Sequence, residues 1–314
     1  MNREHPASTM HHSPPDVSVC IVSWNVADDL RACLESIRAQ RTPPTYEIIV
    51  ADNDSSDDSV PMIREMFPEV ELMVNDSNLG FAKATNQTLR AARGRYLMML
   101  NPDTVLESDS LAKLVAVADA HPEAGIVAPR LIYPDGSLQY SCRRFPTIAA
   151  AVYRNTVFGR LFPQAKPAAD YIMRDCDHET QHDVDWASGA CLLIRREAYE
   201  EVGELDEGFV WGSEDVDYCF RMHREGWSVL YSPVTDVVHA VGRSTDQAVV
   251  PTIVRTHRGM YRLYSKHFAR NAVSRAFVWL GVWLRAGLLI ASWETRRVIR
   301  KAWAEFRTLV GGRK

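Results

Sequence analysis

The chain has 314 residues, of which 46% are apolar, and a formal net charge of −4. This length suffices for one large domain or two small ones, and the composition is that of an ordinary folded protein with a substantial core. These values exclude a chain that is too short or too polar to fold.

The net charge conceals a strong asymmetry along the chain. Residues 255–314 contain 14 Lys and Arg but only two acidic residues, a local charge of +12. The first 254 residues carry 22 basic and 38 acidic side chains, which gives −16. A basic tail on an acidic body indicates a polyanionic partner, either a membrane or a nucleic acid. Of these two we expect the membrane surface and no nucleic acid.

The amino-terminal stretch and the cysteines bear on the cellular compartment. Residues 1–16 are polar and contain prolines, without the apolar run of a signal peptide, and we expect them to be disordered. The six cysteines are scattered and include no C-x-x-C pair. This pattern is typical of reduced thiols in a cytosolic protein rather than of a disulfide framework.

Strands and helices are predicted to alternate through the first hundred residues. Apolar runs rich in β-branched residues predict strands over residues 17–23, 46–51, 70–74 and 96–100. Helical spacing predicts helices over residues 28–40 and 82–92, and one between them that buries Val60, Ile63, Met66 and Phe67. This alternation is typical of βαβ units and predicts a mostly parallel sheet. Each strand runs into polar residues at its end, which is the edge where such sheets bind ligands.

The second half of the chain is less regular. We expect a helix around residues 111–118, a strand over 125–133 and a turn at Pro134–Ser137. Prolines interrupt residues 140–182, and a mobile flap over the site is one interpretation of this stretch. The elements expected after it are a strand over 184–194, a helix over 196–202 ending at Gly203, a helix over 214–224 and strands over 227–231 and 237–239.

Several short motifs occur in an order that resembles one family. The motifs are Ser23-Trp24-Asn25, Asp52-Asn53-x-Ser55-x-Asp57, Asn78-x-Gly80-Phe81 with Asn86, Asn101-Pro102-Asp103, Gly189-Ala190, Trp211-Gly212-x-Glu214-Asp215-x-Asp217 and His239. They make the stretch from Val17 to Ser244 similar to inverting family 2 glycosyltransferases of the GT-A fold, and most similar to bacterial rhamnosyltransferase-type enzymes of cell-envelope polysaccharide synthesis. The resemblance implies an α/β, Rossmann-like, mostly parallel sheet flanked by helices over residues 17–250, followed by a basic amphipathic helical tail over 251–314.

The resemblance also implies a site for the nucleotide-sugar donor. Asp52 resembles the residue that accepts a hydrogen bond from the N3–H of a uracil or thymine ring. Ser23 and Asn25 are expected to line the same nucleotide site. The remaining donor-binding residues that the resemblance implies are Gly80, Asp103, Gly189 and Ala190. The alternative role for Asp52 is to cap the helix that follows it.

Asp103 matches the last carboxylate of the family's Asp-x-Asp element, which holds Mg²⁺ or Mn²⁺ against the donor diphosphate. Hard oxygen ligands suit these ions, and the ion takes up charge that develops on the leaving group. The first position of the element is Asn101 here, so the resemblance assigns the metal to Asp103 with His239 as a second protein ligand. A simple turn after a buried strand and a structural histidine are the alternatives.

Inversion by direct displacement needs one carboxylate base beside the acceptor hydroxyl and no enzyme nucleophile. Asp215 resembles that base, and Glu214, which faces another direction on the helix, is expected to bind the acceptor or hold the loop. Trp186 and Trp211 are expected to stack on the acceptor sugar. The alternatives are helix capping by Ser213 and its acidic neighbours, and core positions for the tryptophans.

The tail has its own apolar segment, residues 276–293, in which Arg285, Ser292 and two glycines are the exceptions. Its length approaches that of a spanning helix, but a central arginine costs about 2.5–3.5 kcal/mol on insertion. Tryptophans and basic flanks favour a helix that lies in the membrane interface. The alternative is a helical hairpin packed on the catalytic domain or on a second subunit of a homo-oligomer.

The leading hypothesis is a metal-dependent inverting glycosyltransferase with a dTDP- or UDP-sugar donor, for which dTDP-rhamnose is a candidate, and a polyprenyl-linked glycan acceptor. It is expected to be cytoplasmic and peripherally associated with the inner face of the cell membrane. The competing hypothesis is a non-catalytic nucleotide-sugar-binding assembly protein that its basic tail recruits to the membrane. The neutral Asn101 favours the second hypothesis, and the Glu214–Asp215 pair argues against it.

Overall fold

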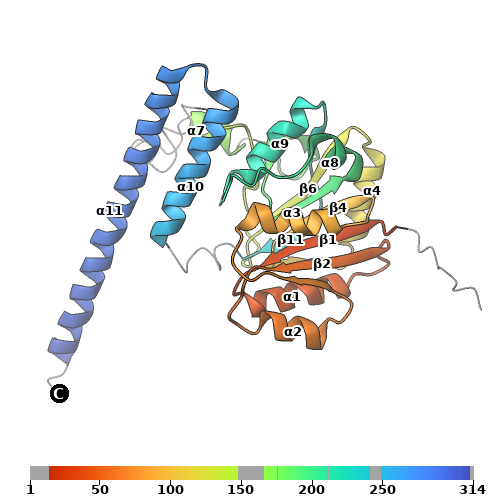
Figure 1. Cartoon of the computed structure of the whole chain (residues 1–314), viewed down its shortest axis with the longest axis horizontal. Helices are drawn as coiled ribbons and strands as arrows, with labels where there is room; N and C mark the ends of the chain where they lie inside the picture. The colour runs from red at the N-terminus through yellow and green to blue at the C-terminus, as the bar shows by residue number, and fades with distance from the viewer. Residues whose placement is uncertain (1–13, 148–165, 175, 211, 241–248, 312–314) are drawn as a thin grey trace, which may run out of the picture.

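The computed structural model describes residues 14–147, 166–174, 176–210, 212–240 and 249–311. In this part of the chain a nine-stranded sheet lies between two layers of helices, and a long helical hairpin stands beside it (Figure 1). Most of the amino-terminal stretch expected to be disordered, residues 1–13, lies outside the described part. Asp16 is an exception to that expectation, because it forms hydrogen bonds with Thr45 and Arg95.

The first half of the chain confirms the predicted alternation of strands and helices. Two strands, β1 and β4, have the predicted bounds, and the others begin and end within two residues of them. The elements are β1 (Val17–Ser23), α1 (Ala27–Arg38), β2 (Tyr46–Asp52), α2 (Ser59–Met66), β3 (Glu71–Val74), α3 (Phe81–Ala91), β4 (Tyr96–Leu100), β5 (Thr104–Leu106), α4 (Ser110–Ala120) and β6 (Ala124–Ile132). The short strand β5 was not predicted.

Helix α2 confirms only part of the predicted buried face, because Ile63 and Phe67 are buried but Val60 is half-buried and Met66 is exposed. Met62 and Ile63 are buried, whereas Met66 is 40% exposed. Phe67 is buried just beyond the last residue of the helix. With only eight residues, α2 has too few positions for apolar spacing alone to identify its inner face.

The second half divides its strands differently from the prediction. Its elements are β7 (Cys142–Arg143), α7 (Lys166–Tyr171), β8 (His182–Asp183), β9 (Trp186–Ala187), β10 (Cys191–Arg195), α8 (Arg196–Val202), α9 (Glu214–Arg224) and β11 (Ser228–His239). The single strand expected over 184–194 is wrong, because β9 pairs with β7 in a separate small sheet and β10 joins the main sheet. The flap expected over 140–182 falls partly on residues 148–165 and 175, outside the described part.

The two short strands expected over 227–231 and 237–239 are one continuous strand, β11. Its register against β6 shifts between Ser232 and Asp236, around Pro233. Proline has no N–H to donate to a ladder, and a bulge accommodates it without ending the strand. The apolar pattern is therefore interrupted at Pro233 although the strand continues through this residue.

The order of strands in the main sheet brings several strand ends to one edge. The order is β3-β2-β1-β4-β10-β6-β11-β5, with β8 also paired to β11. β3, β2, β1 and β4 are parallel, and β10 runs antiparallel to both of its neighbours. Ser23 pairs with Asp52 and Ile21 with Leu100, so the carboxyl ends of β1, β2 and β4 meet.

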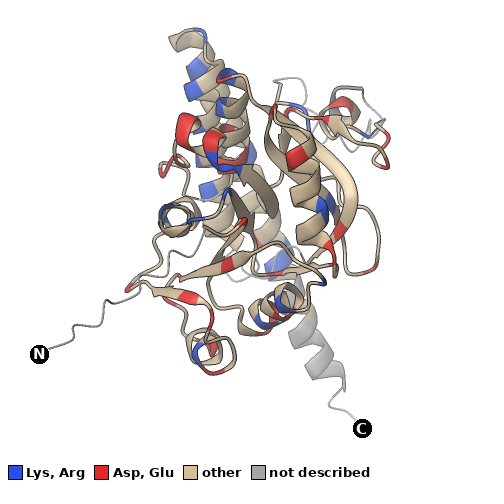
Figure 2. Ribbon diagram, turned by 90° about the vertical axis from the view of Figure 1, so that its right-hand side faces the viewer, with Lys and Arg blue, Asp and Glu red and all other residues tan. Residues whose placement is uncertain are grey.

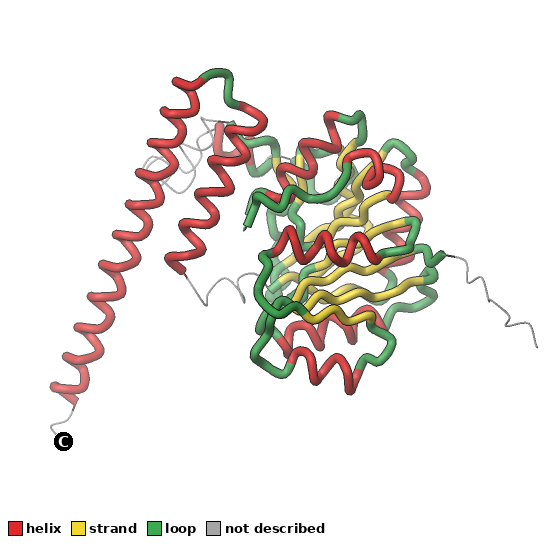
Figure 3. The backbone as a smooth tube through the Cα atoms, in the orientation of Figure 1, coloured by secondary structure: helices red, strands yellow, loops and turns green. Residues whose placement is uncertain are grey.

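Helices cover both faces of the sheet and form two hydrophobic layers (Figure 3). α1, α2 and α4 pack on one face, and α3, α8 and α9 pack on the other. Along β4, Met98 and Leu100 belong to the first layer while Leu97 and Met99 belong to the second. A strand that is buried on both faces has a continuous apolar sequence, which explains why β1 and β4 were recognisable.

The C-terminal segment is an antiparallel helical hairpin. Helix α10 (Val249–Leu263) continues into a π-helical turn, η1 (Tyr264–Phe268), and α11 (Ala272–Gly311) returns beside α10 (Figure 1). The basic residues of the tail are distributed along these elements (Figure 2). By length and composition Ala272–Ile299 is the one described helical stretch able to cross a membrane, and 6% of its most apolar window is buried.

Candidate active site

Ser23 and Asp52 stand side by side at the carboxyl ends of β1 and β2, and both are buried. Asp52 Oδ2 accepts a hydrogen bond from the backbone N–H of Ser55 at 2.9 Å. Asp52 Oδ1 and Ser23 Oγ are buried without a hydrogen-bond partner among the described residues. An unsatisfied buried acceptor is costly, so this pair fits a ligand that brings an N–H group, such as a uracil or thymine ring.

The capping role considered for Asp52 belongs to Asp57. Asp57 Oδ1 accepts hydrogen bonds from the N–H and the hydroxyl of Ser59, the first residue of α2, at 3.1 and 2.6 Å. Asp57 Oδ2 accepts from the N–H of Ala27, the first residue of α1, at 2.9 Å. One aspartate thus satisfies donors at the beginning of two helices, where the backbone has no internal partner.

Asn25 holds the loop that follows β2. Its backbone is left-handed, with φ of 52°, and its N–H donates to Ser55 Oγ at 2.9 Å. Its side-chain Oδ1 accepts from the N–H of Ser56 at 2.7 Å. The structure therefore shows Asn25 bracing the loop beside Asp52, and its contact with a nucleotide stays a prediction.

Gly80 lies in a loop that Asn53 holds against the same edge. Asn53 Oδ1 accepts from the N–H of Leu79 at 3.1 Å, and Asn53 Nδ2 donates to Asn78 Oδ1 at 3.3 Å. Gly80 has φ of 84°, and a Cβ on it would lie 3.3 Å from the carbonyl oxygen of Val210. Glycine suits both this backbone conformation and this close approach.

The two predicted metal ligands meet in the fold. His239 Nε2 at the end of β11 lies 3.4 Å from Asp103 Oδ1 and 3.4 Å from Asn101 Nδ2. His239 Nδ1 donates to Gln139 Oε1 at 2.8 Å, which leaves the lone pair of Nε2 directed to the Asp103 side. The N–H of Ala240 donates to the carbonyl oxygen of Asp103 at 3.0 Å and fixes the two segments together.

These donors fit a divalent cation whose other ligands come from a bound substrate. A carboxylate oxygen and an imidazole nitrogen, with the second ring nitrogen held by another side chain, form a common ligand arrangement. Among the residues described, no group of three or more His, Cys, Asp and Glu is placed to hold a metal ion. Diphosphate oxygens and water would therefore complete the coordination, as is usual for Mg²⁺.

Two consecutive residues connect Asp103 with the predicted base. The N–H of Gly189 donates to Asp215 Oδ2 at 3.2 Å. The carbonyl oxygen of Ala190 accepts from the N–H of Asn101 at 2.9 Å. A Cβ on residue 189 would lie 3.5 Å from the Asp215 Cβ. Gly189 therefore packs closely against Asp215. The Gly189–Ala190 link thus places Asp215 next to the Asn101–Asp103 segment.

Glu214 and Asp215 form a coupled pair at the beginning of α9. Burial, and secondly the charge of Asp215, raise the pKa of Glu214 to about 8. Burial also raises the pKa of Asp215, although backbone N–H groups of Gly189 and Val216 and the nearby Arg143 favour its charged form. Burial thus makes a proton on this pair more favourable than on two ordinary carboxyl groups, while the N–H groups of Gly189 and Val216 provide partners for the charged form of Asp215.

Of the alternative explanation, capping of α9 by Ser213 and its acidic neighbours, the part that concerns Ser213 is wrong, whereas Asp215 Oδ1 does accept the N–H of Val216 in the first turn. Ser213 has a left-handed backbone with φ of 76°, and its side chain makes no capping hydrogen bond. Helix α8, by comparison, ends at Gly203 as expected, with φ of 81°. Other contacts must therefore hold the first turn of α9.

The two tryptophans expected at the acceptor site differ in what the structure says of them. Trp186 is buried, donates its Nε1–H to the carbonyl oxygen of Arg144 at 2.9 Å and lies 5.1 Å from the guanidinium of Arg143. Its position is that of a core side chain, and sugar stacking on it stays a prediction. Trp211 lies outside the described residues.

Gln139 and Arg143 belong to the site but were not predicted. Gln139 orients His239, and Arg143 stands close enough to Asp215 to favour its ionised form. Arg143 lies in the proline-interrupted stretch 140–182, and Gln139 immediately precedes that stretch. Asn86, in contrast, belongs to a recognised motif, and its amide binds the N–H and the carbonyl oxygen of Leu205 at 3.0 Å each.

Comparison with known proteins gives one family and several relatives. The Glycosyl transferase family 2 profile matches residues 18–203, more than half of the chain. The N-acetylglucosaminyl-diphospho-decaprenol L-rhamnosyltransferase of Mycobacterium tuberculosis is 28% identical over 255 residues, which cover 77% of this chain and 82% of that protein. Rhamnosyltransferase WbbL of Escherichia coli is 23% identical over 273 residues, which cover 84% of this chain and 89% of that protein.

A solved glycosyltransferase structure has a similar fold. The mannosyltransferase PcManGT from Pyrobaculum calidifontis, in complex with GDP-Man and Mn²⁺, has a TM-score of 0.54 and 16% identity. The match covers 94% of this chain and 84% of that chain. At this identity the likeness concerns the fold alone, and it confirms the expected GT-A fold class.

Proposed function

This chain belongs to glycosyl transferase family 2, and from that premise we propose that it is an inverting enzyme acting on a dTDP- or UDP-sugar and a lipid-linked glycan acceptor. Two relatives are rhamnosyltransferases by name, which supports rhamnose as the transferred sugar. The name of one of them includes a diphospho-decaprenol acceptor, which supports a polyprenyl-linked acceptor here. The proposed role is in cell-envelope glycan synthesis.

The observation that carries this proposal is the Gly189–Ala190 link. Its two ends bind Asp215 and the Asn101 backbone, so a carboxylate suited to be a base lies beside the segment that carries Asp103. Displacement at an anomeric carbon needs these two groups on opposite sides of one sugar ring. A nucleotide-binding protein without catalysis would have no need of a coupled, buried carboxylate pair at this position.

In the proposed reaction Asp215 takes the proton of the acceptor hydroxyl as its oxygen attacks the anomeric carbon. The new glycosidic bond forms while the bond to the diphosphate oxygen breaks, so the configuration inverts and the nucleoside diphosphate leaves with the electron pair. Each Asp215 oxygen accepts one backbone hydrogen bond and retains a lone pair for the hydroxyl. A carboxylate with a raised pKa is better matched to neutral pH than an ordinary aspartate.

The donor is proposed to bind between two groups of residues. Asp52 Oδ1 and Ser23 Oγ, which lack other partners among the described residues, would bind the pyrimidine ring. Asp103 and His239 would hold Mg²⁺ or Mn²⁺ at the diphosphate, and the hydrogen bond between His239 Nδ1 and Gln139 Oε1 holds the ring with Nε2 on the Asp103 side. When bound, the ion stabilises the charge that develops on the leaving diphosphate.

Helix α11 is the proposed membrane-binding element. Five apolar side chains share one face of this helix and are 60–78% exposed: Val273, Phe277, Leu280, Leu284 and Leu288. Arg285 lies toward α10 instead, with its Nη1 3.5 Å from the Sδ of Met260. One apolar face between basic flanks suits the surface of an anionic membrane, where a polyprenyl-linked acceptor is presented. We propose that the enzyme works at the inner face of the cell membrane.

A transfer assay tests the proposed function. The wild type and Asp215→Asn are compared with dTDP-, UDP- and GDP-sugars, Mg²⁺ or Mn²⁺ and a membrane lipid extract, and NMR determines the configuration of the product. We expect an inverted product and a loss of about 10²–10⁴-fold in turnover for the variant, with donor binding retained. The matched control is Asp119→Asn, which alters an aspartate that binds Tyr96 at the opposite end of β4.

Two results would contradict the proposal. Full turnover of Asp215→Asn would reject Asp215 as the base. Nucleotide binding without turnover of any donor in the wild type would reject catalysis and favour a nucleotide-sugar-binding protein recruited to the membrane.

A further inference from the structure

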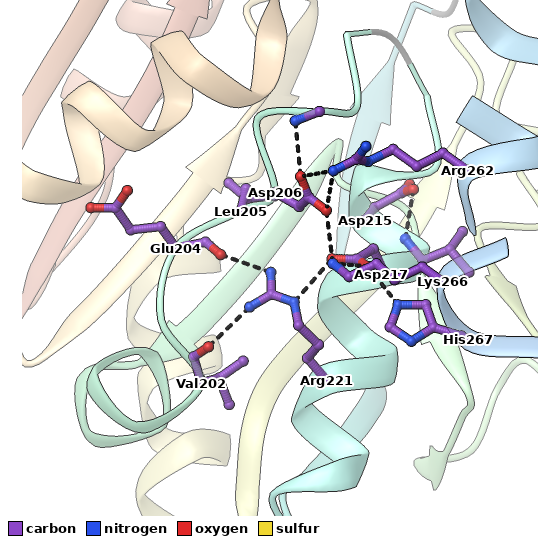
Figure 4. Close-up of polar contacts among 12 residues, drawn as sticks. Val202, Glu204, Leu205, Asp206, Asp215, Asp217, Arg221, Arg262, Lys266 and His267 are labelled. Atoms are coloured by element: carbon purple, nitrogen blue, oxygen red, sulfur yellow. Dashed lines mark hydrogen bonds and ion pairs between the residues drawn. The ribbon is translucent and has the colours of Figure 1, made fainter. Parts of the chain in front are cut away.

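The π-helical turn η1 packs directly against helix α9, which carries the proposed base in its first turn (Figure 4). His267 of η1 is buried, and its ring lies 4.3 Å from that of Phe220 in α9. Phe268 approaches the same ring edge-on at 5.3 Å. π-Helical turns are rare and are frequently found at functional sites. The junction between the C-terminal hairpin and the catalytic domain is therefore a packed one.

Asp217 is the centre of this junction. It is fully buried and lies two residues after Asp215 in the first turn of α9. Its Oδ1 contacts His267 Nε2 at 2.6 Å and Lys266 Nζ at 2.8 Å, and its Oδ2 accepts from Arg221 Nε at 2.9 Å. Burial acts to raise the pKa of Asp217, but the hydrogen bonds from Lys266 and His267 lower it below the usual range. Asp217 is therefore an ionised group with both oxygens engaged.

Arg221 extends this network to the helix before α9. Its Nη1 donates to the carbonyl oxygen of Val202 at 2.9 Å, and its Nη2 donates to that of Glu204 at 2.7 Å. Val202 is the last residue of α8 and Glu204 lies two residues beyond it, where backbone carbonyls have no helical partner. Asp217 and Arg221 together thus fix α9 to α8 on one side and to η1 on the other.

A second aspartate binds the same hairpin without belonging to α9. Asp206 lies in the loop between α8 and α9, and its oxygens accept from Arg262 at 2.8 and 3.0 Å and from Lys266 at 2.8 Å. The guanidinium of Arg262 covers Gly208 so closely that a Cβ there would lie 2.1 Å from Cζ. The hairpin therefore has two acidic attachments, and Asp217 is the one on the helix of the base.

The first turn of α9 depends on such external contacts. Ser213 provides no side-chain cap, and Gly212 and Ser213 both have left-handed backbones. Asp215 is held from one side by Gly189, at 3.2 Å. Asp217 is held from the opposite direction by η1, which comes from beyond the catalytic domain in the sequence. Two contacts thus fix the orientation of the Asp215 carboxylate: the hydrogen bond from Gly189 and the attachment of Asp217 to η1.

We propose that Asp217 is a positioning residue through which η1 sets the orientation of the first turn of α9 and of the Asp215 carboxylate. This inference rests on the proposed function of Asp215 as the base. It makes the C-terminal hairpin part of the catalytic apparatus in addition to its role at the membrane. The segment of the hairpin that is required for this positioning is η1, and α11 contributes only by packing against α10 and η1.

The test compares two equivalent changes of charge at the two attachments. Asp217→Asn is expected to lower kcat by about tenfold or more with a donor KM within about twofold of wild type, because small misplacement of a catalytic group is costly in rate. Asp206→Asn removes a carboxylate that shares the Lys266 partner, and we expect its kcat to stay within about twofold of wild type. Melting temperatures and donor binding are measured for both variants.

A second variant keeps the proposal testable if Asp217→Asn does not fold. His267→Asn breaks one contact and leaves the Asp217 carboxylate paired with Arg221 and Lys266, and its kcat is expected to fall while donor KM is retained. A folded Asp217→Asn or His267→Asn protein with wild-type kcat would overturn the proposal. An equal loss of kcat in Asp206→Asn would also overturn it, since the hairpin would then act through general docking.

The same series separates this proposal from that of the base. If Asp215→Asn retains full turnover, the assignment of the base is wrong and Asp217 has no base to position. If Asp215→Asn is inactive while Asp217→Asn is fully active, the base stands and the positioning role is rejected.

Discussion

The proposed donor edge and the proposed base side of this enzyme, the latter comprising Asp215, Asp217 and the segments that hold them, are built in different ways. At the donor edge, formed by β1, β2 and the loops after them, contacts join neighbouring βα units: Asp52 binds Ser55, and Asn25 binds Ser56. On the base side, Asp215 binds Gly189 across the sheet, and Asp217 binds His267 from the C-terminal hairpin. The first arrangement follows from consecutive strands and loops, whereas the second needs segments that meet only after folding.

This difference indicates how each region should respond to substitution. A residue at the donor edge acts on one ligand group, because its loop is held by many local hydrogen bonds. A residue on the base side acts through the segments that it connects. The four predictions below test this distinction, from the largest expected effect to the smallest.

The first prediction concerns the point at which the two regions meet, Asp103 and His239. Asp103→Asn removes a charged ligand beside the diphosphate, and we expect turnover to fall by on the order of 100-fold. This corresponds to a loss of about 2.8 kcal/mol in transition-state stabilisation, because each 1.4 kcal/mol changes the rate tenfold. Mn²⁺ binding, followed by electron paramagnetic resonance in the presence of UDP or dTDP, should weaken in parallel. Unchanged Mn²⁺ binding would remove Asp103 from the metal site, and Asp109→Asn, at a half-buried position before α4, serves as the control.

The second prediction tests the donor edge alone. Asp52→Asn replaces an acceptor with a donor, and we expect UDP and dTDP to bind about 10–100-fold more weakly, because a hydrogen bond to a charged group contributes about 1.5–3 kcal/mol. CDP should lose much less, since cytosine N3 accepts a hydrogen bond. Isothermal titration with the three nucleotides measures this, and equal losses for UDP and CDP would contradict the assignment of Asp52 to the ring.

The third prediction extends the base side to the membrane. Leu284→Glu combined with Leu288→Glu places two charges on the apolar face of α11, and binding to vesicles that contain phosphatidylglycerol should fall by at least about tenfold. Vesicle flotation measures the bound fraction. Val74→Glu, at an exposed apolar position on β3, is the control. Vesicle binding that is unaffected by the double variant would mean that another surface contacts the lipid.

The fourth prediction follows from the raised pKa of Glu214. An unfolded glutamate has a pKa of about 4.3, so the proton that Glu214 holds to about pH 8 stabilises the fold at low pH, and this contribution is lost as the pH rises. Relative to the wild type, the Tm of Glu214→Gln should be higher near pH 9 than near pH 5 by at least roughly 2–4 °C, the shift that about 1 kcal/mol produces, because the contribution is lost progressively between the two pKa values.

Calorimetry at the two pH values, with Glu225→Gln as the control, measures this difference in Tm. Glu225 is exposed at the other end of α9, so its replacement should have little effect at either pH. A Tm difference for Glu214→Gln that is the same at both pH values would show that its ionisation does not limit stability.

Several parts of the fold and the site followed from the sequence alone. The bounds of β1 and β4 were correct because strands buried on both faces are continuous apolar runs. The ends of α8 and α9 were correct because glycines follow them and apolar residues recur at helical spacing within them. The motifs placed Asp52 and Asp103 at strand ends, since a strand and the loop after it are adjacent in the sequence.

Other features were decided by the tertiary structure. β11 is one strand because pairing with β6 continues past the bulge at Pro233, which interrupts the apolar pattern. Gln139 orients His239, and His267 binds Asp217, through contacts between segments that are far apart in the sequence. Periodicity and motifs report the local preferences of the chain, whereas long-range contacts depend on how complete elements pack. The sequence by itself thus predicted most of the elements and placed Ser23, Asp52 and Asp103 at strand ends, whereas contacts between distant segments decided how β9, β10 and β11 divide and how Asp215 and Asp217 are held.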